Sequence, residues 1–400
     1  MRVALVYDCL YPSTVGGAER WLRRLAETLA ADHEVTYLTR RQWERGEQPI
    51  PGVECVAVSP GGALHREDGS RRPLPALLFG LGVLWHLVRR RGHYDAVHCL
   101  SYPYLGLIAV RIALAGAPVR IVCEWLECLS DDYWRSYGRV EGRVGRALER
   151  LCVRLTPEAV AFSQLTARRL RERGLRSEPQ LLGGLAELAA LEPPAPAAPD
   201  ERPLVLFVGR HVADKGVGAL ADALALAMER RPGLTAVIAG DGPERGRVLE
   251  RLRELGIAAD VSTPGFVGGV ELERLYRRAA CVVAPSRRDG FGMVVAEAAA
   301  RGIPVVVSAA PDNAAAERVV EGENGAIAPS AAPRDLAAAI LRVLDGREEL
   351  RQRTARWFAA NADSLSIERS LERARALYGH DGTGRAADRA RPRSDRAATR

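Results

Sequence analysis

The chain has 400 residues, a formal net charge of +7 at pH 7 and a hydrophobic fraction of 47%. The length predicts two domains of about 150–200 residues, and the composition excludes a fibrous or wholly disordered chain. The positive charge favours an anionic partner. The seven scattered cysteines show neither zinc spacing nor a disulfide framework, which favours a reducing compartment. Because the first residues enter a strand-like run without signal-peptide character, we expect a cytoplasmic protein.

Apolar runs alternate with helical patterns throughout the first half, which we assign to a domain at residues 1–182. Residues 3–7 form a strand-like run, and a Gly-Gly turn then leads into a helical pattern at 18–30. Further strand candidates are residues 35–39, 53–58, 95–100, 119–123 and 159–162. Such alternation implies right-handed crossovers and a mostly parallel, doubly wound sheet.

A Pro/Ala-rich linker at residues 183–202 separates this series from a second one at 203–361. Strand candidates in the second domain are residues 204–208, 234–239, 281–284 and 304–307, and helical patterns follow at 332–344, 347–360 and 367–378. We expect the segment 362–378 to pack back on the first domain. Residues 379–400 are basic and lack apolar periodicity, which predicts a disordered tail.

Lys215 is the only lysine among the 57 basic residues, and it lies in a glycine-bounded turn after the predicted strand at 204–208. A compact ammonium group suits a close contact with a phosphate oxygen. Gly209 and Arg210 close the strand, so the turn would place two cations and free backbone N–H groups around one small anion. The alternatives are chance for Lys215 and a surface ion pair for Arg210.

A second cluster, residues 285–298, joins a predicted strand to a helix that begins near Gly292. The N–H groups of Gly292 and Met293 would be unpaired first-turn donors that point at an anion. Asp289 and Glu297 would both reach one elongated ligand and accept hydrogen bonds from sugar and ribose hydroxyls. The alternative is that Asp289 caps the helix and Glu297 is solvated.

Together these motifs resemble the nucleotide-sugar domain of family 4 glycosyltransferases of the GT-B fold. The matching stretches are residues 209–216, 239–243, 265–267, 285–298, 302–306 and 321–325. In the first half, residues 16–20 resemble the family's flexible loop over the donor. The resemblance covers nearly all of residues 1–378, and it implies two Rossmann-like domains that face each other across a substrate cleft.

By this resemblance the chain would be a retaining hexosyltransferase that needs no metal or other cofactor. Its catalytic residues would be Arg210, Lys215 and Asp289: the two cations hold the donor diphosphate, and Asp289 binds donor-sugar hydroxyls. Glu297 would bind the ribose. The donor site would also include Gly16, Gly17, Gly209, Phe291, Gly292 and Met293. Positive charge stabilises a diphosphate as it leaves, and the acceptor would be a glycan or a lipid-linked sugar.

Two positions depart from the family pattern. The family usually has glutamate where Asp289 stands, and many members have a histidine near the end of the strand equivalent to residues 119–123. On the acceptor side the candidates are Glu19, His98 and Glu124. Glu124 would replace the missing histidine by hydrogen bonding or have a structural role, and His98 would be either a cleft residue or a core histidine.

Residues 73–88 are strongly apolar, and arginines on both sides extend the segment to 71–91. The segment is too short to span a bilayer comfortably. One interpretation is a helix that lies on an anionic membrane surface, which would make the protein peripheral on the cytoplasmic face. The other is an ordinary helix packed on the first sheet.

Two further functions stay open. One is a nucleotide-sugar epimerase of similar two-domain build, for which we identify no acid/base set. The other is a catalytically weak GT-B scaffold that binds a nucleotide sugar or a partner enzyme. We do not expect nucleic-acid binding, because the basic stretches lack interleaved aromatic residues.

Overall fold

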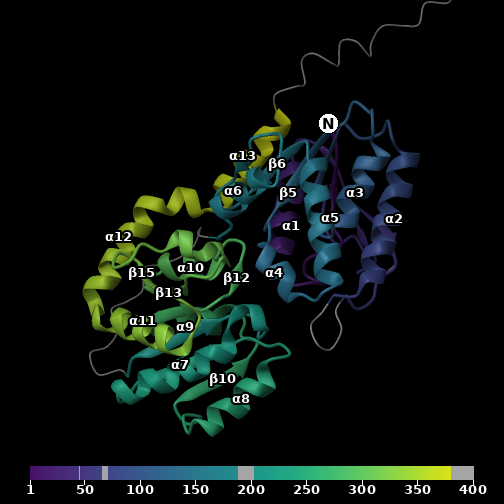
Figure 1. Cartoon of the computed structure of the whole chain (residues 1–400). Helices are drawn as coiled ribbons and strands as arrows, with labels where there is room; N and C mark the ends of the chain where they lie inside the picture. Colours follow the sequence, from purple (N-terminus) through teal and green to yellow (C-terminus); the bar gives the residue numbers. More distant parts are fainter. Residues whose placement is uncertain (45, 65–70, 188–201, 380–400) are drawn as a thin grey trace, which may run out of the picture.

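The computed structural model describes residues 1–44, 46–64, 71–187 and 202–379. Within these ranges the chain forms two α/β domains, each built on one parallel sheet (Figure 1). The predicted α/β class with two Rossmann-like domains is therefore confirmed. The predicted tail at 380–400 and most of the predicted linker, residues 188–201, lie outside the described residues.

The first sheet has seven parallel strands in the order β3-β2-β1-β4-β5-β6-β7. The strands are β1 (Arg2–Val6), β2 (Glu34–Arg40), β3 (Glu54–Ser59), β4 (Ala96–Leu100), β5 (Arg120–Trp125), β6 (Glu158–Ala161) and β7 (Gln180–Leu181). Val3 on β1 lies opposite both Val35 on β2 and Ala96 on β4. The strand order reverses between β1 and β4, and ligands of doubly wound sheets bind at the carboxyl ends on either side of such a reversal.

Helices cover both faces of this sheet. The helices are α1 (Gly17–Leu29), α2 (Pro73–Arg89), α3 (Tyr104–Ala113), α4 (Asp131–Ser136), α5 (Glu141–Leu155) and α6 (Gln164–Glu172). α1 contributes Trp21, Leu22 and Leu25 to the core on one face. α2 contributes Phe79 and Val83 to the core on the other face, which it shares with α3, α4, α5 and α6. Apolar residues that recur every three or four positions give each helix its buried stripe.

The second sheet has six parallel strands in the order β10-β9-β8-β11-β13-β15. The strands are β8 (Leu204–Val208), β9 (Thr235–Ala239), β10 (Val261–Gly265), β11 (Ala279–Ala284), β13 (Val305–Ser308) and β15 (Gly325–Ala328), and β12 (Arg288–Asp289) pairs separately with β14 (Asp312–Asn313). The sequence did not reveal β10 or β15. Both are short, and β10 contains a proline and polar residues instead of a continuous apolar run.

The helices of the second domain also form two layers. One layer has α7 (Val217–Arg230), α8 (Arg245–Glu254) and α11 (Pro333–Asp345), and the other has α9 (Gly269–Arg278) and α10 (Met293–Ala299). Two 3-10 turns, η1 (Ala213–Lys215) and η2 (Ala314–Arg318), lie at the carboxyl-end side of the sheet. Apart from β10, the strands of the large sheet are mostly buried on both faces and therefore form continuous apolar runs.

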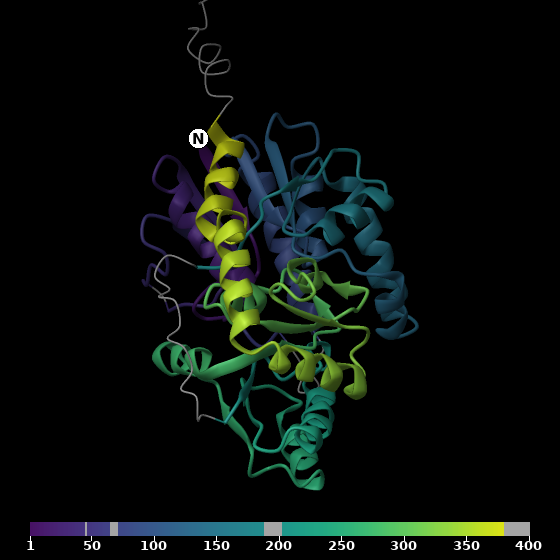
Figure 2. The same cartoon turned by 90° about the vertical axis from the view of Figure 1, so that its left-hand side faces the viewer.

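The last two helices cross from the second domain to the first (Figure 2). α12 (Arg347–Leu365) is followed by α13 (Ile367–Gly379), which places Leu371 in the first-domain core beside α1. Ala186 pairs with this crossing: its N–H donates to Leu365 O (3.2 Å), and its carbonyl accepts from the Ile367 N–H (3.0 Å). The predicted linker start at 183 is therefore wrong, because the segment through Ala186 is packed.

We expect Leu371→Ala to lower the free energy of unfolding by about 2–5 kcal/mol, because it would open a cavity between α13 and the first-domain core. Leu371 is 6% exposed. Urea denaturation followed by tryptophan fluorescence measures the loss. Glu372→Ala is the matched control, since this neighbour is 67% exposed and should change stability by less than about 0.5 kcal/mol. Equal losses in the two variants would contradict the packing of α13.

Candidate active site

Polar contacts join the two domains where the carboxyl ends of their strands face each other. Arg288 of β12 donates from Nε to Glu127 Oε2 (2.7 Å) and from Nη1 to Tyr133 Oη (2.7 Å). Ser130, the N-cap of α4, donates from Oγ to Asp312 Oδ2 (2.6 Å). These bonds hold the two domains together beside Asp289, the neighbour of Arg288, and we refer to this boundary between the domains as the cleft.

Lys215 and Asp289, 74 residues apart in sequence, form an ion pair in this cleft. Lys215 Nζ lies 2.6 Å from Asp289 Oδ2, and the two side chains are 26% and 18% exposed. Gly216 makes this approach possible. Its φ of 69° is left-handed, and a Cβ there would lie within van der Waals radii of Pro285 O, so only glycine lets the β8 loop close on the β11 loop.

The second oxygen of Asp289 organises the turn before α10. Oδ1 accepts from the N–H groups of Phe291 (3.1 Å) and Gly292 (2.7 Å). The prediction of a free Gly292 N–H is therefore wrong, because the Asp289 carboxylate already accepts from it. Among the described residues no acceptor lies at the Met293 N–H, so this first-turn donor still faces the cleft.

The surroundings of Asp289 decide its charge. Burial raises the pKa of Asp289, but the Lys215 ammonium and the N–H groups of Phe291 and Gly292 outweigh that effect and leave the pKa below its ordinary value. The carboxylate is therefore ionised at neutral pH. A buried, ionised group of this kind is costly unless it is paired, and Lys215 provides the pairing.

The β8 loop itself supplies fewer free donors than the sequence predicted. The N–H of Gly209 donates to Ala239 O (3.1 Å), and those of Lys215 and Gly216 donate within the loop. Arg210 is exposed, and its guanidinium has no hydrogen bond or ion pair within the described ranges. Arg210 and Lys215 both lie in this turn, and the predicted free N–H groups are not those of Gly209, Lys215 or Gly216, which already have acceptors.

Glu297 lies one turn into α10 and is half-buried. Its Oε2 accepts from Tyr276 Oη (2.9 Å), and burial raises the pKa of that phenol well above its ordinary value. Arg301 stacks on the Tyr276 ring at 4.5 Å and donates to the Glu297 carbonyl (2.7 Å). Glu297 is therefore half-buried and hydrogen-bonded to Tyr276, so the alternative interpretation that Glu297 is solvated does not hold.

The β1 loop approaches the same place from the first domain. A Cβ on Gly17 would lie 2.6 Å from Met293 Sδ, so the loop rests against the first turn of α10. Glu19 is 8% exposed and accepts from Tyr7 Oη (2.9 Å). Burial, together with Glu19, raises the pKa of Tyr7 well above its ordinary value. Glu19 thus holds the loop through Tyr7.

His98 and Glu124 do not reach the cleft. Both side chains are fully buried, and His98 Nε2 lies 2.8 Å from Glu124 Oε2. The same oxygen accepts from Trp21 Nε1 (2.8 Å), and the other ring nitrogen of His98 lies 2.7 Å from Tyr378 Oη of α13. The acceptor-side prediction for His98 and Glu124 is wrong: they form a buried polar network that ties α1 and α13 to the sheet.

Three charged residues with notable partners escaped the sequence analysis. Asp8 lies two residues after β1, is fully buried and is ion-paired with Arg71, whose guanidinium stacks on Tyr102 at 4.6 Å. Arg318 covers the Phe291 ring at 3.6 Å, and burial lowers its pKa to about 10. An aspartate directly after the apolar run at residues 3–7 was a signal for Asp8. Arg71 and Arg318 carried none, because arginine occurs throughout this chain.

Two family descriptions together match most of the chain. Residues 16–186 match the glycosyl transferase 4-like domain, and residues 190–357 match the glycosyl transferases group 1. The first matched range ends at residue 186, after the last strand of the first sheet, and the second begins at residue 190.

Relatives and solved structures agree with this match. The chain is 36% identical to a glycogen synthase of Mycobacterium tuberculosis over 381 residues, 86% of each protein. It is 27% identical to a D-inositol 3-phosphate glycosyltransferase of Segniliparus rotundus, over 91% of this chain and 84% of the relative. The fold is similar to that of sucrose-phosphate synthase from Thermosynechococcus elongatus (TM-score 0.75, 21% identity, 94% and 98% covered). It is also similar to Anabaena HepE in complex with UDP and glucose (TM-score 0.70, 20% identity, 95% and 100% covered).

The Asp289 environment predicts a pH-dependent contribution to stability. Because the folded pKa lies below the unfolded one, ionised Asp289 stabilises the fold above the unfolded pKa of about 3.9, and this contribution is lost as the pH falls through the folded pKa. We expect the difference in unfolding free energy between the wild type and Asp289→Asn to be constant from about pH 5 upward and to shrink below about pH 4. Denaturant titrations across this range measure it. A difference that grows as the pH falls would contradict the assignment.

Proposed function

Because the chain belongs to the family 4 glycosyltransferases of the GT-B fold, we propose that it moves a hexose from a nucleotide diphosphate sugar to a hydroxyl acceptor. The transfer retains the anomeric configuration and needs no metal. The acceptor is a precursor of a lipid-linked or cell-surface glycan.

The Lys215–Asp289 pair, with Glu297 one turn into the helix α10 that follows Asp289, is the observation that carries this proposal. In the reaction, the bond from the anomeric carbon to the phosphate oxygen breaks, and its electron pair stays on the phosphate. Lys215 and the free guanidinium of Arg210 stabilise that developing charge. The acceptor oxygen forms the new bond on the same face of the sugar, and its proton passes to the leaving phosphate oxygen.

Asp289 and Glu297 have separate tasks in this scheme. Asp289 Oδ1 stays in the turn before α10, whereas Oδ2 exchanges Lys215 for a sugar hydroxyl when the diphosphate takes the ammonium. Glu297 keeps one oxygen on Tyr276 and offers the other to the ribose. Anabaena HepE, whose fold is similar, has been solved with UDP and glucose, and this supports testing UDP-glucose first.

The Lys215→Ala variant tests the role of the pair. We expect turnover to fall at least ~100-fold, about 2.7 kcal/mol of transition-state stabilisation, because the leaving diphosphate loses its closest cation. The measurement is nucleotide release from UDP-, GDP- and ADP-hexoses with metal chelated and with bacterial lipid extract as acceptor. Arg230→Ala, at an exposed position of α7, is the control and should behave as the wild type. Near-normal turnover of Lys215→Ala would refute the mechanism.

A catalytically weak scaffold is the second candidate. The observation that favours it is the pairing of Asp289 with both Lys215 and the Gly292 N–H, two groups that a donor would need. The same panel separates the two functions. A scaffold binds one donor without releasing its nucleotide, whereas the transferase releases it only when acceptor is present.

We also propose that α2 rests on an anionic membrane surface. One face of α2 packs on the sheet through Phe79 and Val83, while the opposite face exposes apolar side chains to the extent of 39–62%. The exposed residues are Leu74, Leu77, Leu78, Leu81, Trp85 and Val88. A helix with apolar residues all around has a second apolar partner besides its own core. None of the described helices has the length and apolarity needed to cross a bilayer.

The double variant Leu81→Ser/Trp85→Ser tests this contact. We expect its partition onto phosphatidylglycerol vesicles to fall at least ~10-fold, because two apolar anchors are removed from the interface. Vesicle flotation at an ionic strength of about 0.15 M measures the partition. Val270→Ser removes an apolar residue that is 91% exposed on α9 and is the control. No flotation of the wild type would sink the membrane proposal.

A further inference from the structure

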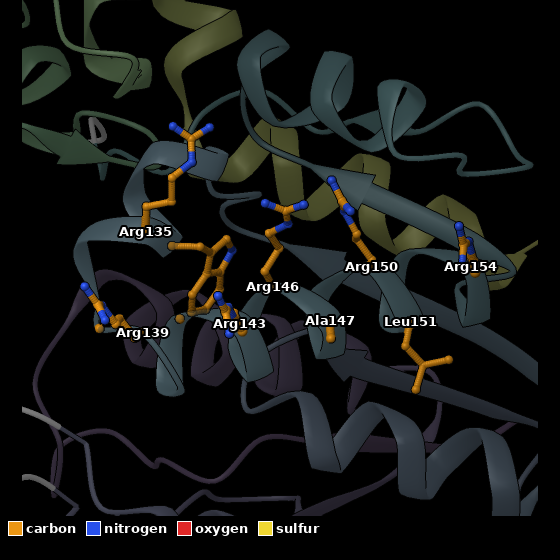
Figure 3. Close-up of a pocket in the computed structure, with 11 residues that line it drawn as sticks. Arg135, Arg139, Arg143, Arg146, Ala147, Arg150, Leu151 and Arg154 are labelled. Atoms are coloured by element: carbon orange, nitrogen blue, oxygen red, sulfur yellow. The ribbon is translucent and has the colours of Figure 1, made fainter.

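A groove lined by arginines runs along α4 and α5 on the outer surface of the first domain (Figure 3). Its lining comprises Trp134, Arg135, Gly138, Arg139, Gly142, Arg143, Arg146, Ala147, Arg150, Leu151 and Arg154. We call it the arginine groove. Six of its eleven lining residues are arginines, and no acidic residue is among them.

The arginines of α5 form a row. Arg143, Arg146, Arg150 and Arg154 follow one another at intervals of three, four and four residues, which places them on one side of the helix. Successive members are about one helical turn, ~5.4 Å, apart along the axis. Figure 3 shows the row extending from Arg143 to Arg154, with Arg135 on α4 at one end. A chain with repeated negative charges would meet one cation per turn.

Three of the six groove arginines have an ion-pair partner: Arg135 pairs with Asp132 of its own helix, and Arg146 and Arg150 share one partner. Within the described ranges Arg139, Arg143 and Arg154 have no ion pair. Arg146 and Arg150 share one oxygen of Asp131, at 3.5 and 3.3 Å. Arginines shared by one carboxylate leave excess positive charge in the groove.

The other exposed helices provide an internal comparison. On α8, Arg251 pairs with Glu254 of its own helix and with Asp222 of α7. On α9, Arg277 pairs with Glu273. These helices have the acid–base pattern of a solvated surface, and α5 lacks it. Arginine usage across the whole chain therefore does not explain the row.

One end of the groove adjoins the catalytic cleft. Tyr133, beside the groove residue Trp134, accepts from Arg288 Nη1 (2.7 Å), and Arg288 precedes Asp289. Ser130 at the start of α4 donates to Asp312 of the second domain. A ligand in the groove thus extends directly toward the reacting centre.

We propose that the arginine groove binds an anionic acceptor glycan, a chain with carboxylate or phosphate groups whose end hydroxyl enters the cleft. This inference rests on the proposed glycosyl transfer and names the class of its acceptor. Guanidinium groups match carboxylate and phosphate in a bidentate manner. The excess cations are complementary to such a chain, and their one-per-turn spacing suits a repeating charge.

The shape of the groove favours a chain over a flat membrane. Arg146 and Arg150 are only 37% and 43% exposed and lie in the hollow. Gly142 and Gly145 let Trp134 of α4 pack closely against α5 at one end of the groove, because a Cβ at either position would overlap Trp134. A bilayer surface contacts protruding side chains, as on α2, whereas a single chain can enter a groove.

The triple variant R139Q/R143Q/R154Q tests the inference, since it removes three unpaired charges without leaving an unpaired acid. The matched control is R230Q/R253Q/R278Q, which removes three exposed arginines from the second domain. The probes are oligogalacturonate, uncharged dextran of equal length and phosphatidylglycerol vesicles, each with the full-length protein. Thermal unfolding confirms that the variants fold.

We expect oligogalacturonate to bind the wild type and the control, and to bind the groove variant about tenfold more weakly, equivalent to about 1.4 kcal/mol. The dependence of its affinity on salt should also weaken in the groove variant, and dextran should not bind. No binding by the wild type, or equal weakening in both triple variants, would overturn the proposal. So would loss of vesicle flotation with oligogalacturonate binding intact, which would make the groove a membrane contact.

Donor binding separates this proposal from the one on which it rests. The groove variant should bind the nucleotide sugar as the wild type does, because no groove residue contacts Lys215, Asp289 or Glu297. If the wild type binds oligogalacturonate but no nucleotide sugar, the proposed transfer fails and the groove stands. If it binds and turns over a nucleotide sugar but no oligogalacturonate, only the groove fails.

Discussion

The Asp289 carboxylate is the interaction on which this site depends, because it joins the β8 loop to the turn before α10. One oxygen holds the turn before α10, and the other holds Lys215 at the end of the β8 loop. Both bonds are charge-assisted, and the pair is mostly removed from water. Removal of either partner would leave an uncompensated charge, so the β8 and β11 loops keep their distance even without a ligand.

A second set of charges sets the position of the domains relative to each other. Asp312 accepts from Ser130 and Arg169 of the first domain, and Glu317 accepts from the first N–H groups of α6. Arg318 donates to Phe162 O (2.9 Å). These contacts come from η2 and the strand before it, while α12 and α13 cross on the other side. These polar contacts on one side and the covalent connection through α12 and α13 on the other therefore set the relative position of the two domains.

The sequence predicted the fold well because parallel sheets leave a local signal. Strands buried on both faces are continuous apolar runs, and the ten strand candidates correspond to ten of the thirteen strands that the structure describes in the two large sheets. The sequence missed the two-residue β7, the four-residue β15 and β10, which contains a proline. The donor-side residues were also accessible, since Lys215 is unique in composition and Asp289 lies in a glycine-rich turn. The pairing of these two residues was not, because it depends on a distance across 74 positions of sequence.

The errors share one physical cause. His98, Glu124 and the Gly292 N–H were assigned by position at a strand or helix end, yet most polar groups that a fold buries find a partner within the protein. Glu124 found Trp21 and His98 inside the core, and the Gly292 N–H found Asp289. The sequence shows where along a strand or helix a polar group lies. Only the packed structure shows whether that group already has a hydrogen-bond partner within the protein.

The same reasoning explains why one ammonium stands among so many guanidinium groups. Arg40, Arg173 and Arg301 each bond to two or more partners through their forks, and they act as fixed ties between loops. A tie of that kind is released only when several bonds break together. Among the described residues Lys215 makes one side-chain hydrogen bond, to Asp289, so a single exchange of partner transfers it to a phosphate. In the proposed reaction Lys215 must change partners, and its ammonium group, with one hydrogen bond to break, does so at a lower cost than these arginines would.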